Sequence, residues 1–249
     1  MIVIKTAREL RKMQDACTLS ARALKIGGEA VEPGVSTYEI DRIIRKYIED
    51  QGAKPSFLGY GGFPGSACIS VNNVVIHGIP SKKIILKEGD IVSIDVGAFL
   101  EGFHGDNAYT FPCGDISKEA KALLDATKES LYQGINQALA GNRIGDIGAA
   151  VQEYAEARGY SVVRDFVGHG VGAKLHEEPS VPNFGTKGRG YRLTPGMTIA
   201  IEPMINMGDY HVRVLDDEWT TVTADGKLSA HFEHTVAVTP DGPVIMTKP

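Results

Sequence analysis

The sequence predicts an α+β fold, on three observations. Apolar residues recur at helical spacing in four stretches, and strand-like stretches lie between them without a strict strand–helix–strand rhythm. This mixture favours antiparallel hairpins over a doubly wound parallel sheet. The third observation is a faint internal repeat. The chain has 249 residues, of which 43% are hydrophobic and 23% charged. That composition is globular, and a chain of this length folds without disulfides or a structural metal.

The helices follow from capping signals and apolar stripes. Thr6–Glu9 and Ser36–Glu39 form capping boxes, and we expect the helices that follow to end at Gly27 and Gly52. Their apolar stripes are core faces rather than cofactor sites. The four helices are expected over residues 7–26, 37–51, 117–140 and 144–158.

Strands are expected where apolar and β-branched residues alternate with polar ones. The alternation is clearest in Ile91, Ser93 and Asp95 against Val92, Ile94 and Val96. The expected strands are residues 68–76, 90–99, 103–111, 161–167, 197–205 and 229–238.

The internal repeat appears when the chain is aligned with itself at an offset of about 107 residues. It pairs Gly34 with Gly141, Ile40 with Ile147, Tyr47 with Tyr154, Gly52 with Gly159, Gly89 with Gly196, Ile94 with Ile201, and Asp95 with Glu202. Scattered matches at one offset also arise by chance. If the halves are related, Asp95 and Glu202 lie across a two-fold axis. No Pro- or Ser-rich linker separates the halves, so we expect a single domain over residues 1–249.

Net charge and cysteine content limit which partners and which cellular compartment the sequence favours. The 26 basic and 31 acidic residues give a net charge of −5, which disfavours direct nucleic-acid binding and an anionic membrane surface. The three cysteines, Cys17, Cys68 and Cys113, contain no CxxC pair. No signal-peptide core or membrane-length apolar run is present, so we expect a cytoplasmic protein.

Four carboxylates on apolar-flanked strands carry the chemical signal. Asp95 and Asp106 flank a turn near residues 100–102, so a hairpin there places them opposite or diagonal on one face. Glu202 and Glu233 lie in similar apolar settings. Any one of them alone is best explained as a salt-bridged strand acid. Too few Lys or Arg residues lie on these strands to pair all four, so a pair of cations is favoured.

His169 supplies a nitrogen donor, because it stands between two glycines that allow close backbone approach. One histidine with four carboxylates carries a formal charge of −4, which two divalent cations neutralise. An oxygen-rich set of this kind suits Mn²⁺, Fe²⁺, Co²⁺ or Zn²⁺. His77 and His176 lie in Gly- or Pro-containing segments and are open to either a structural or a functional interpretation. His104, His211, His231 and His234 are interpreted as structural or surface residues.

These motifs resemble those of the type I methionine aminopeptidases over essentially the whole chain. The motifs are CISVNNVVIHGIP (68–80), DIVSIDVGAFLEGFHGD (90–106), VGHGVGAKLHEEP (167–179), IAIEPM (199–204) and FEHTVAV (232–238). The resemblance implies the pita-bread (creatinase/aminopeptidase) fold, an antiparallel sheet flanked by helices with internal pseudo-two-fold symmetry. It also implies removal of the N-terminal methionine from nascent polypeptides, with a small second residue preferred, by a cytoplasmic monomer near the ribosome.

The same resemblance assigns the site residues. It implies that two divalent metal ions are held by Asp95, Asp106, His169, Glu202 and Glu233. It implies that a water between the ions attacks the scissile carbonyl, with Glu202 carrying the proton and His77 and His176 acting on the substrate side. The methionine pocket is expected to be lined by Phe57, Tyr60, Phe63, Cys68, Leu175 and Trp219. Some relatives have Cys at the position of Phe57 and Phe at that of Leu175, which bears on the pocket's shape.

Three rivals share the fold. An X-Pro aminopeptidase or prolidase usually adds an N-terminal domain, whereas this chain begins close to its first predicted helix. A type II methionine aminopeptidase needs an inserted helical subdomain, for which the chain has no room. A catalytically dead binding protein is disfavoured because the ligand and histidine positions are all intact.

Overall fold

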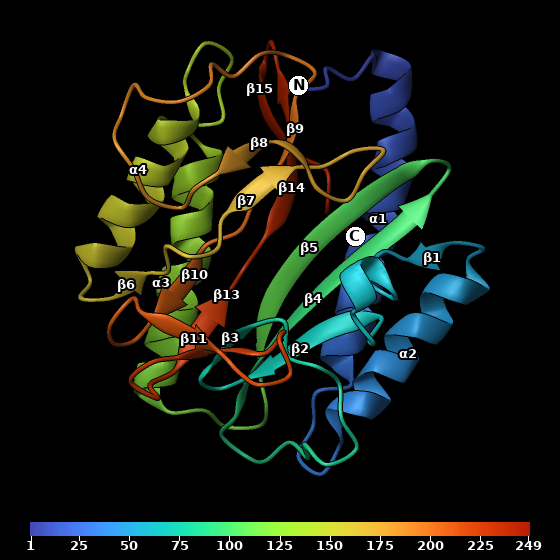
Figure 1. Cartoon of the computed structure of the whole chain (residues 1–249), viewed down its shortest axis with the longest axis vertical. Helices are drawn as coiled ribbons and strands as arrows, with labels where there is room; N and C mark the ends of the chain where they lie inside the picture. The colour runs from blue at the N-terminus through green and yellow to red at the C-terminus, as the bar shows by residue number, and fades with distance from the viewer.

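Four helices frame the molecule in the computed structural model, which describes residues 1–249 (Figure 1). They are α1 (Ala7–Glu29), α2 (Thr37–Asp50), α3 (Lys118–Ile135) and α4 (Ile144–Glu156). Both predicted capping boxes are formed, at Thr6 and Ser36. The expected end of the first helix at Gly27 is wrong. A Cβ there would lie 2.6 Å from Ile44 Cδ1, so this glycine allows α2 to pack closely against α1.

The third helix is also shorter than expected, ending at Ile135 rather than near residue 140. The backbone N–H groups of Gln137 and Ala138 donate to carbonyls three residues earlier, so the chain leaves the helix through tight turns.

Short strands make four sheets, and every strand pair is antiparallel. The first sheet holds β1 (Lys54–Pro55), β2 (Ala67–Val71), β4 (Ile91–Leu100) and β5 (Phe103–Pro112). The largest runs β15 (Gly242–Ile245), β14 (His234–Thr239), β9 (Thr198–Ile201), β7 (Gly168–Gly170) and β8 (Glu177–Val181). The others are β13 (Ser229–His231), β10 (Met204–Asn206) and β6 (Ser161–Val162), and β11 (Val212–Val214), β12 (Thr221–Thr223) and β3 (Val74–Ile76). A short 3₁₀ turn, η1, spans Tyr60–Gly62.

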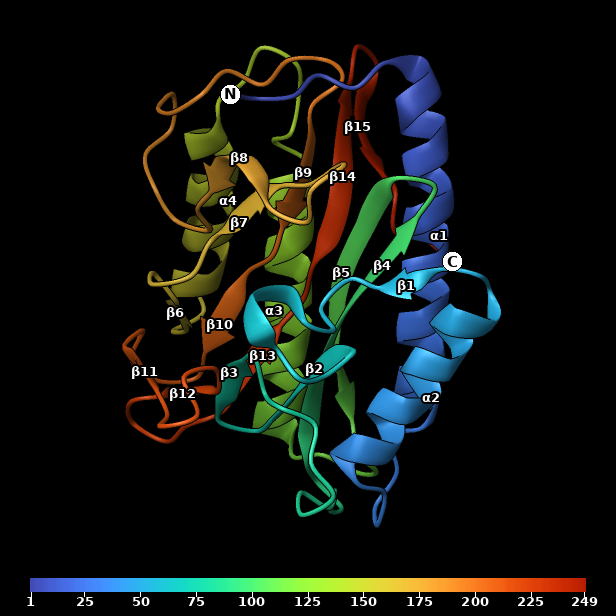
Figure 2. The same cartoon turned by 45° about the vertical axis from the view of Figure 1, so that its right-hand side comes forward.

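The helices divide between the two halves of the sheet structure. Figure 2 shows α1 and α2 on one side and α3 and α4 on the other. The helix α1 packs against β4 and β5, and α2 packs against α1, β1 and β2. One apolar cluster lies between α1, α2 and the first sheet, and a second lies between α3, α4 and the later strands. The predicted α+β class and the antiparallel, helix-flanked arrangement are confirmed. No helix has the length and apolar character needed to cross a bilayer.

Three of the predicted strands are broken, and two of the breaks carry acids. The strand expected over 68–76 splits at Asn72, whose φ of 57° lies in the left-handed region that Asn tolerates. The strand over 197–205 breaks at Glu202–Pro203, where proline cannot donate to a ladder. The strand over 229–238 breaks at Phe232–Glu233. Only residues 161–162 of the strand expected over 161–167 are formed.

The internal repeat has a structural counterpart at the offset found in the sequence. The helix α4 occupies the place of α2, β6 that of β1, and β9 begins where β4 does. The paired turn glycines Gly34 and Gly141 have φ values of 93° and 96°, and Gly89 and Gly196 have 89° and 91°. Local backbone geometry therefore repeats along with sequence, and it brings β4 and β9 to corresponding positions.

The two halves are joined along a seam between β5 and the segment leading into β14. The hydroxyl of Thr235 donates to the carbonyl of Asp106 at 2.7 Å, and the backbone N–H of Glu233 donates to the carbonyl of Ala108 at 2.9 Å. Two of the acids singled out in the sequence thus lie on either side of this seam.

Candidate metal centre and substrate pocket

One cavity of about 200 Å³ opens between the halves and gathers the residues predicted from the sequence. Sixteen residues line it, and all except Ile76, Phe166 and Val167 are ones that the resemblance assigns to the site. The acids and His169 occupy one end and the aromatic residues the other. Phe166 and Ile76, which lie near His77, were not assigned to the site from the sequence.

The hairpin of β4 and β5 sets the relation between Asp95 and Asp106. Its two-residue turn at Glu101 and Gly102, both with positive φ, pairs Leu100 with Phe103. Asp106 is then opposite Gly97, two residues from Asp95, so the two acids are diagonal neighbours on one face.

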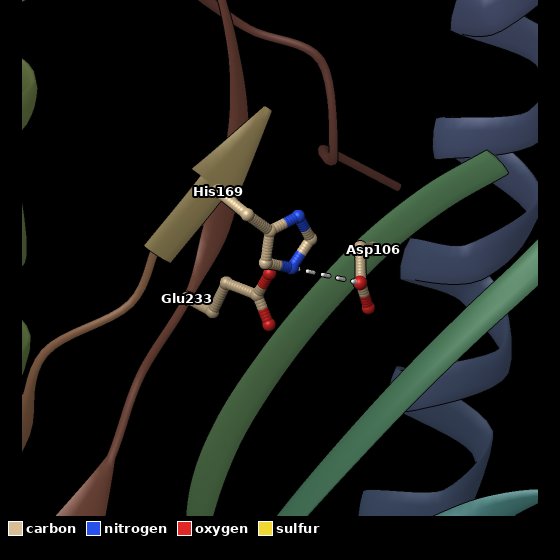
Figure 3. Close-up of side chains that lie close together, drawn as sticks. All are labelled: Asp106, His169 and Glu233. Carbon is tan, nitrogen blue, oxygen red and sulfur yellow. Dashed lines mark ion pairs between the residues drawn. The ribbon is translucent and has the colours of Figure 1, made fainter. Parts of the chain in front are cut away.

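The other donors come from the second half of the chain. His169 is the middle residue of β7, and Glu202 and Glu233 lie at the two strand breaks, where they lie outside the ladders. His169 Nε2 is 3.5 Å from Glu202 Oε1 and 3.8 Å from Asp106 Oδ2. One donor atom each of Asp106, His169 and Glu233 lies within 4.8 Å of the others (Figure 3).

His169 presents its Nε2 atom as a potential ligand. Its Nδ1 lies 2.8 Å from the carbonyl oxygen of Gly170, which only accepts, so Nδ1 donates and Nε2 keeps its lone pair. Burial lowers the pKa of His169 to about 3, which keeps the ring neutral. A neutral, oriented imidazole is the form that binds metals.

The carboxylates have no cationic side chain to balance them. Their only ion-pair partners are histidines, and Asp95 Oδ1, Asp106 Oδ1 and Glu233 Oε1 are buried without a hydrogen-bond partner. Burial raises the pKa of Asp106 to about 7. Burial, and then the neighbouring carboxylates, raise the pKa values of Asp95, Glu202 and Glu233 well above the usual range. Orphaned, converging oxygens of this kind fit divalent cations.

His231, interpreted from the sequence as a structural or surface residue, lies in this neighbourhood. It is buried, and its Nε2 lies 3.8 Å from Glu202 Oε2 with no hydrogen-bond partner. Its position two residues before Glu233 was the available signal, because alternate residues of an extended chain share a face. Of the other histidines interpreted as structural or surface residues, His211 is exposed, His234 bonds Thr247 and His104 bonds Ser56.

The apolar end of the cavity is a compact pocket. Phe57, Phe63, Cys68 and Leu175 are each 9% exposed or less and pack together with Trp219 against them. The rings of Phe63 and Trp219 meet edge to face at 5.2 Å. Tyr60 differs from the other residues assigned to the pocket. It is 46% exposed and stands at the rim, where its hydroxyl hydrogen-bonds with His176 Nδ1 at 2.8 Å.

The two remaining histidines lie between the donors and the pocket. The rings of His176 and His169 are 4.2 Å apart, and the bond to Tyr60 leaves His176 Nε2 free. His77 has a φ of 58° and meets Phe166 and Trp219 edge to face. Burial lowers the pKa of His77 to about 4. Strained backbone at a non-glycine residue in a cavity is typical of a functional position.

Comparisons with known proteins agree with this geometry. Residues 11–240 match the model of metallopeptidase family M24. The chain is 56% identical to a methionine aminopeptidase of Clostridium perfringens over 247 residues, 99% of each chain. The crystal structure of methionine aminopeptidase from Thermotoga maritima superposes with a TM-score of 0.98 at 44% identity, covering all of both chains.

A more distant solved structure bears on the X-Pro aminopeptidase or prolidase alternative. The prolidase of Pyrococcus horikoshii has a TM-score of 0.81 at 23% identity, and the match covers 64% of it, so that likeness shows the pita-bread fold alone. The family match implies divalent metal ions at the centre described above. The chain belongs to the methionine aminopeptidases of metallopeptidase family M24.

Proposed function

We propose that the chain removes the N-terminal methionine from peptides and nascent proteins, preferring those with a small second residue. The observation that carries this proposal is that one cavity joins a cluster of oxygen and imidazole donors to a closed apolar pocket. Aromatic rings and the Cys68 sulfur suit a flexible, polarisable thioether. The preference for a small second residue rests on the resemblance of the sequence motifs to those of the type I methionine aminopeptidases.

The cation donors are proposed to be Asp95, Asp106, His169, Glu202 and Glu233. Their formal charge of −4 and their unpartnered oxygens support two divalent ions, of Mn, Fe, Co or Zn. When bound, such ions polarise a carbonyl and lower the pKa of water toward neutrality.

The remaining roles belong to side chains of the protein. Glu202 is proposed to take a proton from the attacking water and return it to the leaving amine, since its carboxylate faces the cavity. His176 is proposed to donate from Nε2 to the developing oxyanion, because Nδ1 is engaged by Tyr60. His77 is proposed to contact the substrate near the scissile bond. The free α-amine of the substrate, held by the buried carboxylates, restricts the enzyme to chain ends.

Cleavage of three tripeptides tests the proposal. Purified protein is stripped with a chelator, reloaded with Mn²⁺, Fe²⁺, Co²⁺ or Zn²⁺ in turn, and given Met-Ala-Ser, Leu-Ala-Ser and Ala-Pro-Ser. We expect Met-Ala-Ser to be cut fastest with at least one ion and not at all after chelation. Preferred cleavage of Ala-Pro-Ser would establish the X-Pro aminopeptidase alternative. Absence of turnover with every ion would indicate a binding protein of the same fold.

We further propose that residues 1–249 form one catalytic domain of two related halves that acts as a cytoplasmic monomer on nascent chains near the ribosome. The repeated elements support the two related halves, and the three buried, unpaired cysteines support the compartment. Sedimentation of the purified protein and ribosome co-pelleting test the two assembly statements.

A further inference from the structure

The N-terminal segment lies against the loop that carries His176, although the two are far apart in sequence. Figure 2 shows this segment crossing one end of the molecule before it enters α1. Lys5 is anchored there by its own backbone, whose N–H donates to the carbonyl of Gly196 at 2.8 Å. Its ammonium lies 2.6 Å from Glu177 Oε2.

This ion pair is unlike the others of the protein. The side chains of Lys5 and Glu177 are 3% and 6% exposed, whereas every other pair that involves Lys or Arg lies at the surface. A buried pair is on balance no more stabilising than apolar residues of the same size, because both charges are desolvated. Stability alone therefore does not explain why a charged pair occupies this place.

The second oxygen of Glu177 closes the turn before it. Glu177 Oε1 accepts a hydrogen bond from the backbone N–H of Lys174 at 3.2 Å, and Gly172 N donates to the carbonyl of Lys174 at 3.0 Å. The turn has no regular secondary structure to hold it. It packs tightly on the pair, since a Cβ on Gly172 would lie 2.6 Å from both Glu177 Oε1 and Lys5 Cε.

The residues held inside this turn are those that face the substrate. Leu175 is 2% exposed and belongs to the apolar pocket, and His176 lies beside His169 at the donor end. We propose that Lys5 is a positioning residue: through Glu177 it fixes the turn that presents His176 to the scissile bond and Leu175 to the first side chain of the substrate. The inference rests on the proposed function and adds a residue that touches no substrate.

The test compares variants that distinguish the effect of the Lys5–Glu177 ion pair on the turn from its effect on stability. We call this ion pair the tie. Lys5→Met removes the tie and leaves Glu177 charged, and Lys5→Arg keeps a charged donor. The double variant Lys5→Met/Glu177→Gln removes both charges and keeps an acceptor for Lys174. Ile40→Ala, on the buried face of α2, is the control for lost stability without a change at the turn. The assay measures kcat and KM on Met-Ala-Ser and Leu-Ala-Ser with saturating Mn²⁺.

We expect Lys5→Met to lower kcat for Met-Ala-Ser about 10- to 100-fold, the size of effect that a misplaced catalytic group produces, and to change KM less. The preference for Met over Leu should narrow as well, because Leu175 moves with the turn. Lys5→Arg should recover most of kcat. The double variant should regain melting temperature without regaining kcat. The proposal would be overturned if Lys5→Met had the wild-type kcat. It would also be overturned if the double variant regained kcat together with its melting temperature, or if Ile40→Ala lost as much kcat as Lys5→Met.

Limited trypsin digestion gives a readout that needs no turnover. Lys174 is exposed within the turn, so loss of the tie should speed cleavage after Lys174 relative to cleavage after Lys227, an exposed site elsewhere. Equal cleavage ratios in the wild type and in Lys5→Met would show that Lys5 does not hold the turn. If the wild-type protein releases no methionine, the proposed function fails, and the digestion still decides whether Lys5 fixes this loop.

Discussion

Neutralising one buried carboxylate should have opposite effects on stability with and without cations. Burial raises the pKa of Asp106 from 3.8 to about 7 in the absence of metal. The native state then binds more protons than the unfolded chain between about pH 4 and pH 7, so the stability of the metal-free protein falls as pH rises through that window. At about 1.4 kcal/mol per pH unit, the ionised Asp106 costs about 4 kcal/mol at pH 8.

The substitution Asp106→Asn removes this charge but leaves a buried amide. Because Asp106 Oδ1 has no hydrogen-bond partner, the amide costs about 1–3 kcal/mol. The net gain is about 1–3 kcal/mol, or roughly 3–10 °C in melting temperature for a chain of this size. Bound cation stabilises the wild type by about 4.1 kcal/mol at 1,000 times its dissociation constant, which exceeds that net gain. The variant lacks one donor and should gain little.

Thermal melts at pH 5.5 and pH 8, in chelator and in saturating Mn²⁺, measure these effects. We expect the variant to be more stable than the wild type in chelator at pH 8 and less stable in Mn²⁺. We also expect its melting temperature in chelator to change less between pH 5.5 and pH 8. Asp125→Asn is the matched control, since Asp125 is exposed and pairs only with Lys121. A variant that melts below the wild type in chelator, or that gains as much from Mn²⁺, would refute the reasoning.

Three further outcomes follow from the pocket. His176→Ala should lower kcat about 10²- to 10³-fold with little change in KM, as for loss of one oxyanion donor, and a KM effect alone would show that it only binds substrate. Gly97→Ala should raise KM for methionyl peptides, because the new Cβ would lie 2.8 Å from Phe57 Cε1 and push that ring into the pocket; an unchanged KM in steady-state assays would contradict this. Competition assays should rank peptides with N-terminal methionine and norleucine above leucine, by about 1–3 kcal/mol for a misplaced methylene, and lysine last, because its charge would be desolvated.

The features that could be predicted from the sequence are those that local structure decides. The two-residue turn fixes the register of its hairpin, so the diagonal placement of Asp95 and Asp106 follows from counting residues. The offset between the halves was visible because turn glycines recur where φ must be positive. The strand breaks at Asn72 and Glu202 were not predicted, although Asn72 and Pro203 are local signals for a break. That the chain passes from one sheet to another at these points is decided by tertiary packing.

The same limit applies to the site. Motifs located the lining residues, but they did not show that Tyr60 stands at the rim, because exposure depends on what packs above the loop. The nearness of His231 to Glu202 was not predicted for a related reason. The sequence does not show which face of a strand is buried, so it does not show which other residues a histidine in that strand faces.

The seam between the halves would give the proposed ions a second role, that of a cross-link. Of the proposed donors, Asp95 and Asp106 come from one half, and His169, Glu202 and Glu233 from the other, so neither half holds the full set. We therefore expect cation affinity to depend on how firmly the halves are joined, in the same way that metal binding contains folding energy in small metalloproteins. Thr235 bonds the backbone carbonyl of Asp106 across the seam, so its loss should weaken cation binding although its side chain is not one of the proposed donors.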